Sequence, residues 1–235
     1  MPVITNIEDL RQLAEKRVPR MFYDYADSGS WTEGTYRANT ADFQGIQLRQ
    51  RVAVNMENRS TATTLVGSIP ARMPVCIAPV GLTGMQHADG EIHAARAAEK
   101  FGIPFTLSTM SICSIEDIAQ HTSAPFIFQL YMMRDREAMA RMIDRCKAAK
   151  CSALVLTLDL QVIGQRHKDL KNGLTAPPRP TLKNILNLVT KPRWCLGMLG
   201  THRRSFGNLV GHVKGVSDMR SLSAWLKVRF SMPTQ

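Results

Sequence analysis

The chain has 235 residues, of which 44% are apolar, so it can bury one sizeable core and its composition excludes fibrous and disordered classes. It holds no run of roughly 18 uninterrupted apolar residues, which a membrane-spanning helix needs, and its start lacks the basic and then apolar pattern of an export signal. We therefore expect a cytoplasmic protein, and its net charge of +11 points to an anionic partner.

Residues 1–73 predict a helical extension ahead of the main domain. Apolar residues at helical spacing predict two helices, over residues 7–16 and 19–26. A third helix is predicted over residues 32–43, after the break DSGS.

Residues 74–159 alternate short apolar runs with longer amphipathic stretches, a pattern typical of successive βα units. Each run is apolar throughout, as expected of parallel strands that helices cover on both faces. The four predicted strands are PVCIAPV (74–80), IPFTLS (103–108), PFIFQLY (125–131) and ALVLTLD (153–159).

The helices between these strands have recognisable starts. Acidic residues open the predicted helix over 89–101, where they suit the helix dipole. Ser114 and Asp135 are predicted N-caps of the next two helices. The repeat length fits a parallel sheet, either doubly wound or part of a (β/α)₈ barrel.

Two observations favour the barrel. None of the strands is followed by a G-x-G-x-x-G or Walker-type glycine loop, which removes the main support for a doubly wound nucleotide-binding sheet. Polar or turn-forming residues also follow all four strands, where a barrel assembles its active site. We expect an α/β fold of the TIM-barrel class with about four βα units present.

Residues 160–235 form a third part, a long basic segment. It holds 13 Lys and Arg against 2 Asp and Glu, whereas residues 1–159 hold 17 of each kind. Four prolines, at positions 177, 178, 180 and 192, predict an irregular stretch that serves as a lid or docking segment. Such a block can meet nucleic acid, anionic lipid or an acidic protein, and charge alone does not choose among them.

One helix is predicted within the basic segment. Leu182, Ile185, Leu186 and Val189 share one helical face, with lysine, arginine and Trp194 nearby. Two interpretations stand: an interfacial anchor on the inner face of the cell membrane, or a lid helix that packs on the barrel.

The five cysteines include no C-x-x-C pair, and no histidines accompany them at zinc spacing. They are expected to be reduced thiols, and no metal site is predicted.

Several motifs together resemble the FMN-dependent 2-hydroxy-acid dehydrogenases and oxidases. The resemblance runs from residue 3 to about residue 230 and, within that family, is most like bacterial respiratory L-lactate dehydrogenases. The motifs that carry it are FYDYADSG, LRQRVAV, PVCIAPVGLTGM, GIPFTLSTMS, FQLY, LTLDLQVIGQRHKDLKNG and GHVKGV.

The resemblance implies roles for residues at the strand ends and in the extension. Ala78 and Pro79 would lie where the first strand approaches the flavin ring of FMN. Ser108, Gln129 and Thr157 would supply neutral hydrogen bonds to its polar edge, by which a protein tunes a flavin.

The resemblance also implies a substrate site for L-lactate or a similar short 2-hydroxy acid. Tyr25 and Tyr131 would face the substrate, and Arg166 would grip its carboxylate through a bidentate guanidinium fork. Asp159 would orient the catalytic base and stabilise its protonated form. The product would be pyruvate, and a respiratory carrier would take the electrons onward.

The family's catalytic base is a histidine in an Asn-His-Gly-Gly segment that has no match in these 235 residues. We therefore expect this chain to represent the amino-terminal part of the fold and to be inactive alone. A homo-oligomer remains open. Two further functions also remain open: a remnant or partner module that does not bind FMN, and, as a distant third, a nucleic-acid-binding protein, which the motifs do not support.

Overall fold

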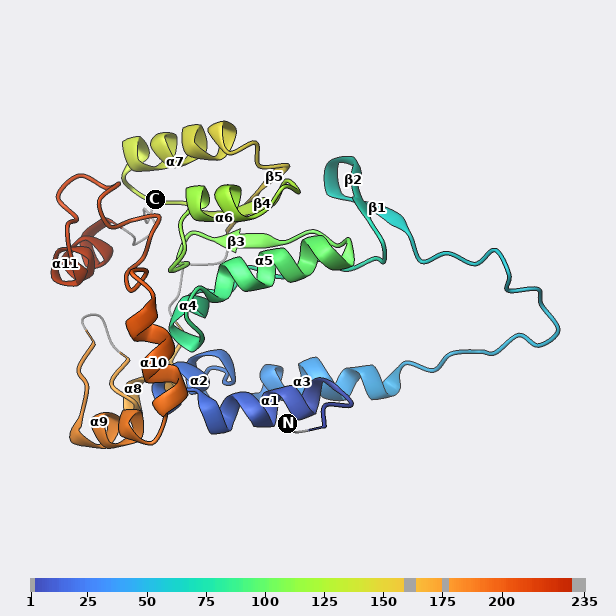
Figure 1. The fold of residues 1–235 in the computed structure, drawn as a ribbon, viewed down its shortest axis with the longest axis horizontal. Helices are drawn as coiled ribbons and strands as arrows, with labels where there is room; N and C mark the ends of the chain where they lie inside the picture. Colours follow the sequence, from blue (N-terminus) through green and yellow to red (C-terminus); the bar gives the residue numbers. More distant parts are fainter. Residues whose placement is uncertain (1–2, 159–163, 175–177, 230–235) are drawn as a thin grey trace.

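A computed structural model describes residues 3–158, 164–174 and 178–229 of the chain. The N-terminal helices and the helical segment over residues 167–200 lie on one side of the helical segment over residues 83–101 (Figure 1). The parallel strands within residues 106–157, with the two helices between them, lie on the other side (Figure 1). A long extended segment loops away from the rest of the molecule and returns to a small hairpin, which lies near one end of the sheet (Figure 1).

The first part of the N-terminal extension holds the three predicted helices. It contains α1 (Ile7–Arg17), α2 (Arg20–Ala26) and α3 (Gly34–Ala41), and a 3-10 turn, η1 (Asp42–Gly45), completes the third predicted helix. A capping box starts α1, because the Asn6 side chain accepts a hydrogen bond from the Asp9 backbone while the Asp9 carboxylate accepts one from the Asn6 backbone.

The antiparallel hairpin was not anticipated from the sequence. It pairs β1 (Thr63–Leu65) with β2 (Ile69–Ala71) through a 3-10 turn, η2 (Val66–Ser68). Each strand has only three residues, which are too few to show an alternating pattern, so the residues alone do not predict it.

A parallel sheet forms the centre of the fold, with strand order β3-β4-β5. The strands are β3 (Thr106–Ser108), β4 (Ile127–Tyr131) and β5 (Ala153–Thr157), each within one of the predicted apolar runs. Their register aligns the carboxyl ends, so that Ser108 pairs with Gln129 and Tyr131 pairs with Thr157.

The prediction of a full strand over residues 74–80 is wrong. Only Ile77 pairs with the sheet, through a parallel bridge to Phe105. The Ile77 amide donates to the Pro104 carbonyl at 2.9 Å, and the Thr106 amide donates to the Ile77 carbonyl at 3.1 Å. The segment therefore lies where a first barrel strand belongs, but its side chains are exposed from Pro74 to Val80, so nothing on its other edge extends the pairing.

Helices connect the strands and cover one side of the sheet. They are α4 (Thr83–Gln86), α5 (Gly90–Phe101), α6 (Ile115–His121) and α7 (Arg136–Ala148). Both predicted N-caps are confirmed, since Ser114 accepts from the Asp117 amide and Asp135 accepts from the Ala138 amide. Leu107 and Phe128 are fully buried in the core between the strands and these helices.

The basic segment is more regular than its prolines suggested. It forms α8 (His167–Lys171), α9 (Leu182–Val189), α10 (Pro192–Gly200) and α11 (Met219–Arg229). The predicted helix around residue 185 is confirmed as α9. A capping box at Thr181 and Asn184 starts it.

The two outer edges of the sheet expose apolar side chains. On β5, Leu154, Val155 and Leu156 are each more than 40% exposed, and Val75 and Val80 on the opposite edge are each 42% exposed. Strands of a parallel sheet are normally covered on both faces, so these edges have the character of surfaces that further strands cover.

An ion pair ties α6 to α7 and provides a test of the packing. The Arg145 Nε and Nη2 atoms donate to both Glu116 carboxylate oxygens, at 2.7 and 2.6 Å. This pairing lowers the pKa of Glu116 from 4.5 to about 2. The Glu116 side chain is 44% exposed, so solvent screening limits the energy of the pair.

We expect Glu116→Gln to destabilise the chain by about 1 kcal/mol at neutral pH, because one neutral bond replaces a bidentate charged pair. A lowered folded-state pKa stabilises above the unfolded-state value, so the difference should vanish as pH falls from 4.5 to about 2. Urea unfolding across this pH range measures it. Glu137→Gln, in an exposed pair with Arg141 at 3.6 Å, is the matched control and should change little. A loss that persists at the lowest pH would contradict the assignment.

Candidate functional site

The carboxyl ends of the three strands are joined by a chain of side-chain hydrogen bonds. Ser108 Oγ donates to Gln129 Oε1 at 3.2 Å, and Gln129 Nε2 donates to Thr157 Oγ1 at 2.7 Å. Ser108 and Gln129 are each only 3% exposed. The parallel register brings these three predicted residues, one from each strand, into a single row.

Residues that the sequence reasoning missed hold this row in place. Thr109 Oγ1 donates to the Gln129 carbonyl at 2.6 Å. Asn208, which is fully buried, donates to the Ser108 carbonyl at 3.3 Å and accepts from the Ile115 amide at 2.9 Å. Asn208 lies about a hundred residues further along the chain and belongs to no motif with a known mechanism, so no local pattern could have found it.

Ala78 and Pro79 lie beside the row, after the Ile77 bridge to β3. Both are exposed, and they leave the backbone of this edge accessible from the side where the strand ends meet. The Leu82 amide then donates to the Met110 carbonyl at 3.1 Å, which fixes the loop after residue 79 against the loop after β3.

Tyr25 reaches this loop from the N-terminal extension. A Cβ added at Gly81 would lie 2.8 Å from the Tyr25 hydroxyl oxygen, so the phenol lies directly against a position where only glycine leaves room. Burial raises the pKa of Tyr25, the Arg166 charge opposes that shift, and nearby Tyr131 adds to it. The phenol is therefore held protonated, as a hydrogen-bond donor.

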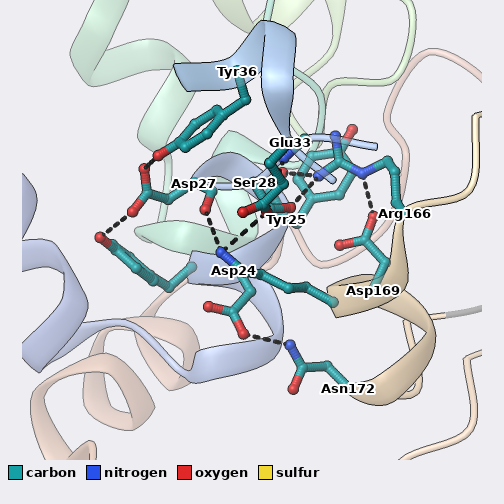
Figure 2. A network of polar contacts seen from close by, with 12 residues as sticks. Asp24, Tyr25, Asp27, Ser28, Glu33, Tyr36, Arg166, Asp169 and Asn172 are labelled. Atoms are coloured by element: carbon teal, nitrogen blue, oxygen red, sulfur yellow. Dashed lines mark hydrogen bonds and ion pairs between the residues drawn. The ribbon is translucent and has the colours of Figure 1, made fainter. Parts of the chain in front are cut away.

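The Arg166 side chain is held by contacts with the N-terminal extension. Its Nε donates to Asp169 Oδ2 at 2.5 Å, and its Nη2 donates to the Tyr25 carbonyl and to Ser28 Oγ (Figure 2). The guanidinium also lies over the Tyr25 ring, with its carbon 5.1 Å from the ring centroid. This arginine thus fixes both the backbone and the ring of Tyr25.

Further contacts join α2 to α8 around this arginine. Asn172 Nδ2 donates to Asp24 Oδ2 at 2.7 Å, and Lys168 Nζ lies 3.2 Å from Glu33 Oε1 (Figure 2). The two segments are about 140 residues apart in sequence, so a sequence pattern does not reveal the pairing.

A cavity of about 410 Å³ lies beside Tyr25, between α2, α4 and the loop after β3. Its walls are mainly apolar, with Met110 among them, and the Asp169 carboxylate contributes the charged group nearest to Arg166. Asp169 Oδ1 is shielded from solvent and has no hydrogen-bond partner among the described residues. Asp159, the remaining predicted site residue, lies outside the described residues.

Comparison with known proteins places these features in a family. The chain matches the FMN-dependent dehydrogenase family over residues 14–233. This chain belongs to the FMN-dependent dehydrogenase family. It is 41% identical over 230 residues to an L-lactate dehydrogenase of Ectopseudomonas mendocina, and 38% identical over 235 residues to one of Caulobacter sp..

Solved structures of the family agree with the fold. The chain is similar to the monotopic membrane protein (S)-mandelate dehydrogenase, with a TM-score of 0.86, 33% identity and 96% of this chain covered. It is also similar to a Pediococcus acidilactici lactate oxidase described as putative, with a TM-score of 0.69, 32% identity and 80% of this chain covered. The chain spans about 60% of the first of these structures and 52% of the second.

The curated relatives show the same proportion, since the chain spans 60% of the Ectopseudomonas mendocina protein and 61% of the Caulobacter protein. The α/β architecture, with a parallel sheet and an N-terminal extension, is that of the TIM-barrel class expected from the sequence, and the described strands form an open sheet.

The residues present fit the cofactor from which the FMN-dependent dehydrogenase family takes its description. An isoalloxazine ring has a polar edge that both donates and accepts hydrogen bonds, and the row of hydroxyl, amide and hydroxyl groups offers neutral partners of both kinds. These side chains are held by the backbone and by Asn208, so the row is pre-formed.

We expect Arg166→Met to destabilise the chain by about 1 to 3 kcal/mol, because it leaves the buried Asp169 carboxylate without its charged partner. Adding Asp169→Asn to that variant should recover part of the loss, since an amide costs less to bury unpaired than a carboxylate. Urea unfolding measures both effects. If the two substitutions were simply additive, Arg166 would not hold Asp169 in the manner described.

Proposed function

We propose that this chain supplies the amino-terminal part of an active site that oxidises L-lactate, or a similar short 2-hydroxy acid, to the 2-oxo acid with FMN. The observation that carries the proposal is the hydrogen-bonded row of Ser108, Gln129 and Thr157 at three adjacent strand ends, with the Tyr25 phenol held nearby. The family match and the L-lactate dehydrogenase relatives support the substrate class.

Each residue contributes a defined action to this reaction. Bound FMN supplies the acceptor for the two electrons and the hydrogen lost from the substrate C2 carbon. Gln129 presents its amide group at the strand ends, oriented by the Ser108 and Thr157 hydroxyls. Ala78 and Pro79 offer accessible backbone at the adjacent edge.

The substrate side of the site is formed by the two tyrosines. The Tyr25 hydroxyl stays protonated because burial raises its pKa, so it can donate to the substrate carboxylate. Tyr131 lies at the carboxyl end of β4, where it pairs with Thr157 of β5. Arg166 has Nε and Nη2 committed to the chain, so its contribution is to fix Tyr25 and, through its charge, to attract the carboxylate. Asp159 would hold the catalytic base.

This proposal requires that the exposed sheet edges be covered. Leu154, Val155 and Leu156 on β5 are more exposed than a core strand tolerates, and the catalytic histidine expected from the family has no counterpart among the residues given. We infer that the remaining βα units complete the site, whether on the same polypeptide or on another.

We expect the purified 235-residue chain not to reduce a dye with L-lactate. Mixing it with FMN and a completing polypeptide, the part of the Ectopseudomonas mendocina L-lactate dehydrogenase that lies outside the match, should yield a yellow complex that does so. Gln129→Leu should reduce activity at least about tenfold, the loss of roughly 1.4 kcal/mol, because it breaks the row. Exposed Gln44→Leu is the control and should have no effect.

The outcomes separate the alternatives. Dye reduction by the chain alone would show that the exposed edges need no completion. A stable complex that remains colourless with FMN would instead support the alternative of a module that does not bind FMN.

We further propose that α9 and α10 attach the protein to an anionic membrane surface, close to its electron acceptor. No helix within the described ranges is long and apolar enough to cross a bilayer. The apolar face of α9 nevertheless points into solvent: Leu182, Ile185, Leu186 and Val189 are 51 to 81% exposed, and Leu196 and Leu199 on α10 are about 70% exposed. The likeness to a monotopic membrane protein supports this proposal. The rival lid interpretation would bury this face instead.

Ile185→Asp with Leu186→Asp should abolish flotation with vesicles of phosphatidylcholine and phosphatidylglycerol, since charged side chains do not enter the acyl boundary. Leu48→Asp with Val52→Asp is the matched control, because both residues are at least 85% exposed on the extended segment. Equal flotation of both variants, or equal flotation on pure phosphatidylcholine, would contradict anchoring that needs anionic lipid.

A further inference from the structure

A second pocket lies away from the strand ends, between α1, the start of α5, α4 and α10. Its volume is about 700 Å³. Arg17, His87, His93 and Arg193 line it, and none of the described residues that line it is acidic. Nothing in the proposed oxidation uses this pocket, and its charge calls for an anionic ligand.

The two arginines are available for such a ligand. Arg17 and Arg193 are both exposed, and neither forms an ion pair with another described residue. The nearby Asp89 carboxylate is committed elsewhere, because Thr201 donates to it at 2.8 Å and Arg203 at 3.0 Å. Asp89 also acts electrostatically on His93, but it forms no ion pair with Arg17 or Arg193, so these two charges stay available to a ligand.

The walls of the pocket are fixed by contacts of α10. Lys191 Nζ donates to the Glu15 carbonyl at 3.2 Å and to the Lys16 carbonyl at 2.5 Å, which holds the start of α10 to the end of α1. Trp194 donates from its ring nitrogen to the Met85 carbonyl at 2.8 Å and stacks on Phe22. Because these contacts flank Arg193, the pocket is built into the fold.

Donor groups line the pocket on the side of α4 and α5. Gln86 Nε2 is shielded from solvent and lacks a hydrogen-bond partner among the described residues, so an acceptor atom from a ligand would satisfy it. His87 Nδ1 lies 2.8 Å from the Ala88 carbonyl, which can only accept, so Nδ1 carries a proton. Nε2 is then an acceptor in the neutral ring and donates to a ligand only when the ring is protonated. His93 packs edge-on against His87, with ring centroids 5.4 Å apart.

The N-terminal end of α5 adds to the positive potential of the pocket. Gly90 begins this helix of 12 residues and lines the pocket, so the positive end of the helix dipole faces the same space. The opposite wall is apolar, formed by Leu10, Leu13, Ala14 and Val18 of α1 and its C-cap.

We propose that this pocket binds a phosphate group, and that its apolar wall favours a phosphate that carries an alkyl substituent. Guanidinium groups match phosphate oxygens through paired hydrogen bonds. The Gln86 amide supplies a further donor, and so does a histidine ring that is protonated. A phospholipid headgroup and a soluble phosphate share this chemistry. The pocket shares α10 with the exposed apolar face, which makes the headgroup the occupant that both surfaces accommodate together.

Binding is tested first with inorganic phosphate and the whole chain. The imidazole ¹H–¹⁵N signals of His87 and His93, assigned with His87→Gln and His93→Gln, should shift and saturate with phosphate. Arg17→Gln with Arg193→Gln should weaken that binding at least about tenfold, the loss of roughly 1.4 kcal/mol. Arg49→Gln with Arg51→Gln removes the same charge from the exposed extended segment and should leave binding unchanged.

Vesicle flotation identifies the source of the phosphate. If free phosphate displaces the chain from vesicles of phosphatidylcholine and phosphatidic acid, and the Arg17 and Arg193 variant floats less, the pocket holds a headgroup. If phosphate binds but flotation is unchanged in that variant, the ligand is a soluble phosphate. The proposal is overturned if the histidine signals do not saturate, or if both arginine variants weaken binding equally while circular dichroism shows them folded.

Discussion

The parallel register of β3, β4 and β5 is the constraint on which the rest of the site depends. Because carboxyl ends of parallel strands meet at one edge, pairing Ser108 with Gln129 and Tyr131 with Thr157 brings distant residues into one row. Each member is short and neutral, and the hydrogen bonds among them leave little freedom. A slip of one residue in any strand would turn its member away, since alternate side chains point to opposite faces.

The second requirement is that the N-terminal extension be held against these strand ends. Arg166 achieves this by binding the Tyr25 carbonyl, the Ser28 hydroxyl and the Asp169 carboxylate together. Charge-assisted hydrogen bonds of this kind are strong when partly buried, so the basic segment holds α2 in place through Arg166. The position of the Tyr25 phenol thus depends on residues some 140 positions later in the chain.

Local sequence signals were sufficient for elements that are determined by interactions within a few residues. The runs that became β4 and β5, and the caps at Ser114 and Asp135, follow from apolar runs and side-chain chemistry within a few residues. The row of strand-end residues came from the family resemblance, and the structure brings its members together. Long-range contacts were not predictable in this way: Arg166 was assigned to a substrate carboxylate, whereas its contacts are to the extension, and Asn208 gave no signal at all.

The predicted first strand shows where an apolar run misleads. Its apolar run indicated a buried strand, yet only Ile77 pairs, through one bridge to Phe105, and the residues from Pro74 to Val80 are exposed. At the other edge of the sheet, β5 also exposes apolar side chains. An apolar run therefore indicates a strand, but it does not say how much of that strand is paired or covered among the described residues.

Amide hydrogen exchange of the chain bound to the completing polypeptide, with and without FMN, tests the central claim most directly. If the strand ends and the extension converge on the cofactor, FMN should protect residues 106–109, 127–131 and 153–157 together with α2. Protection confined to other segments, or none at these strand ends despite bound FMN, would contradict the account.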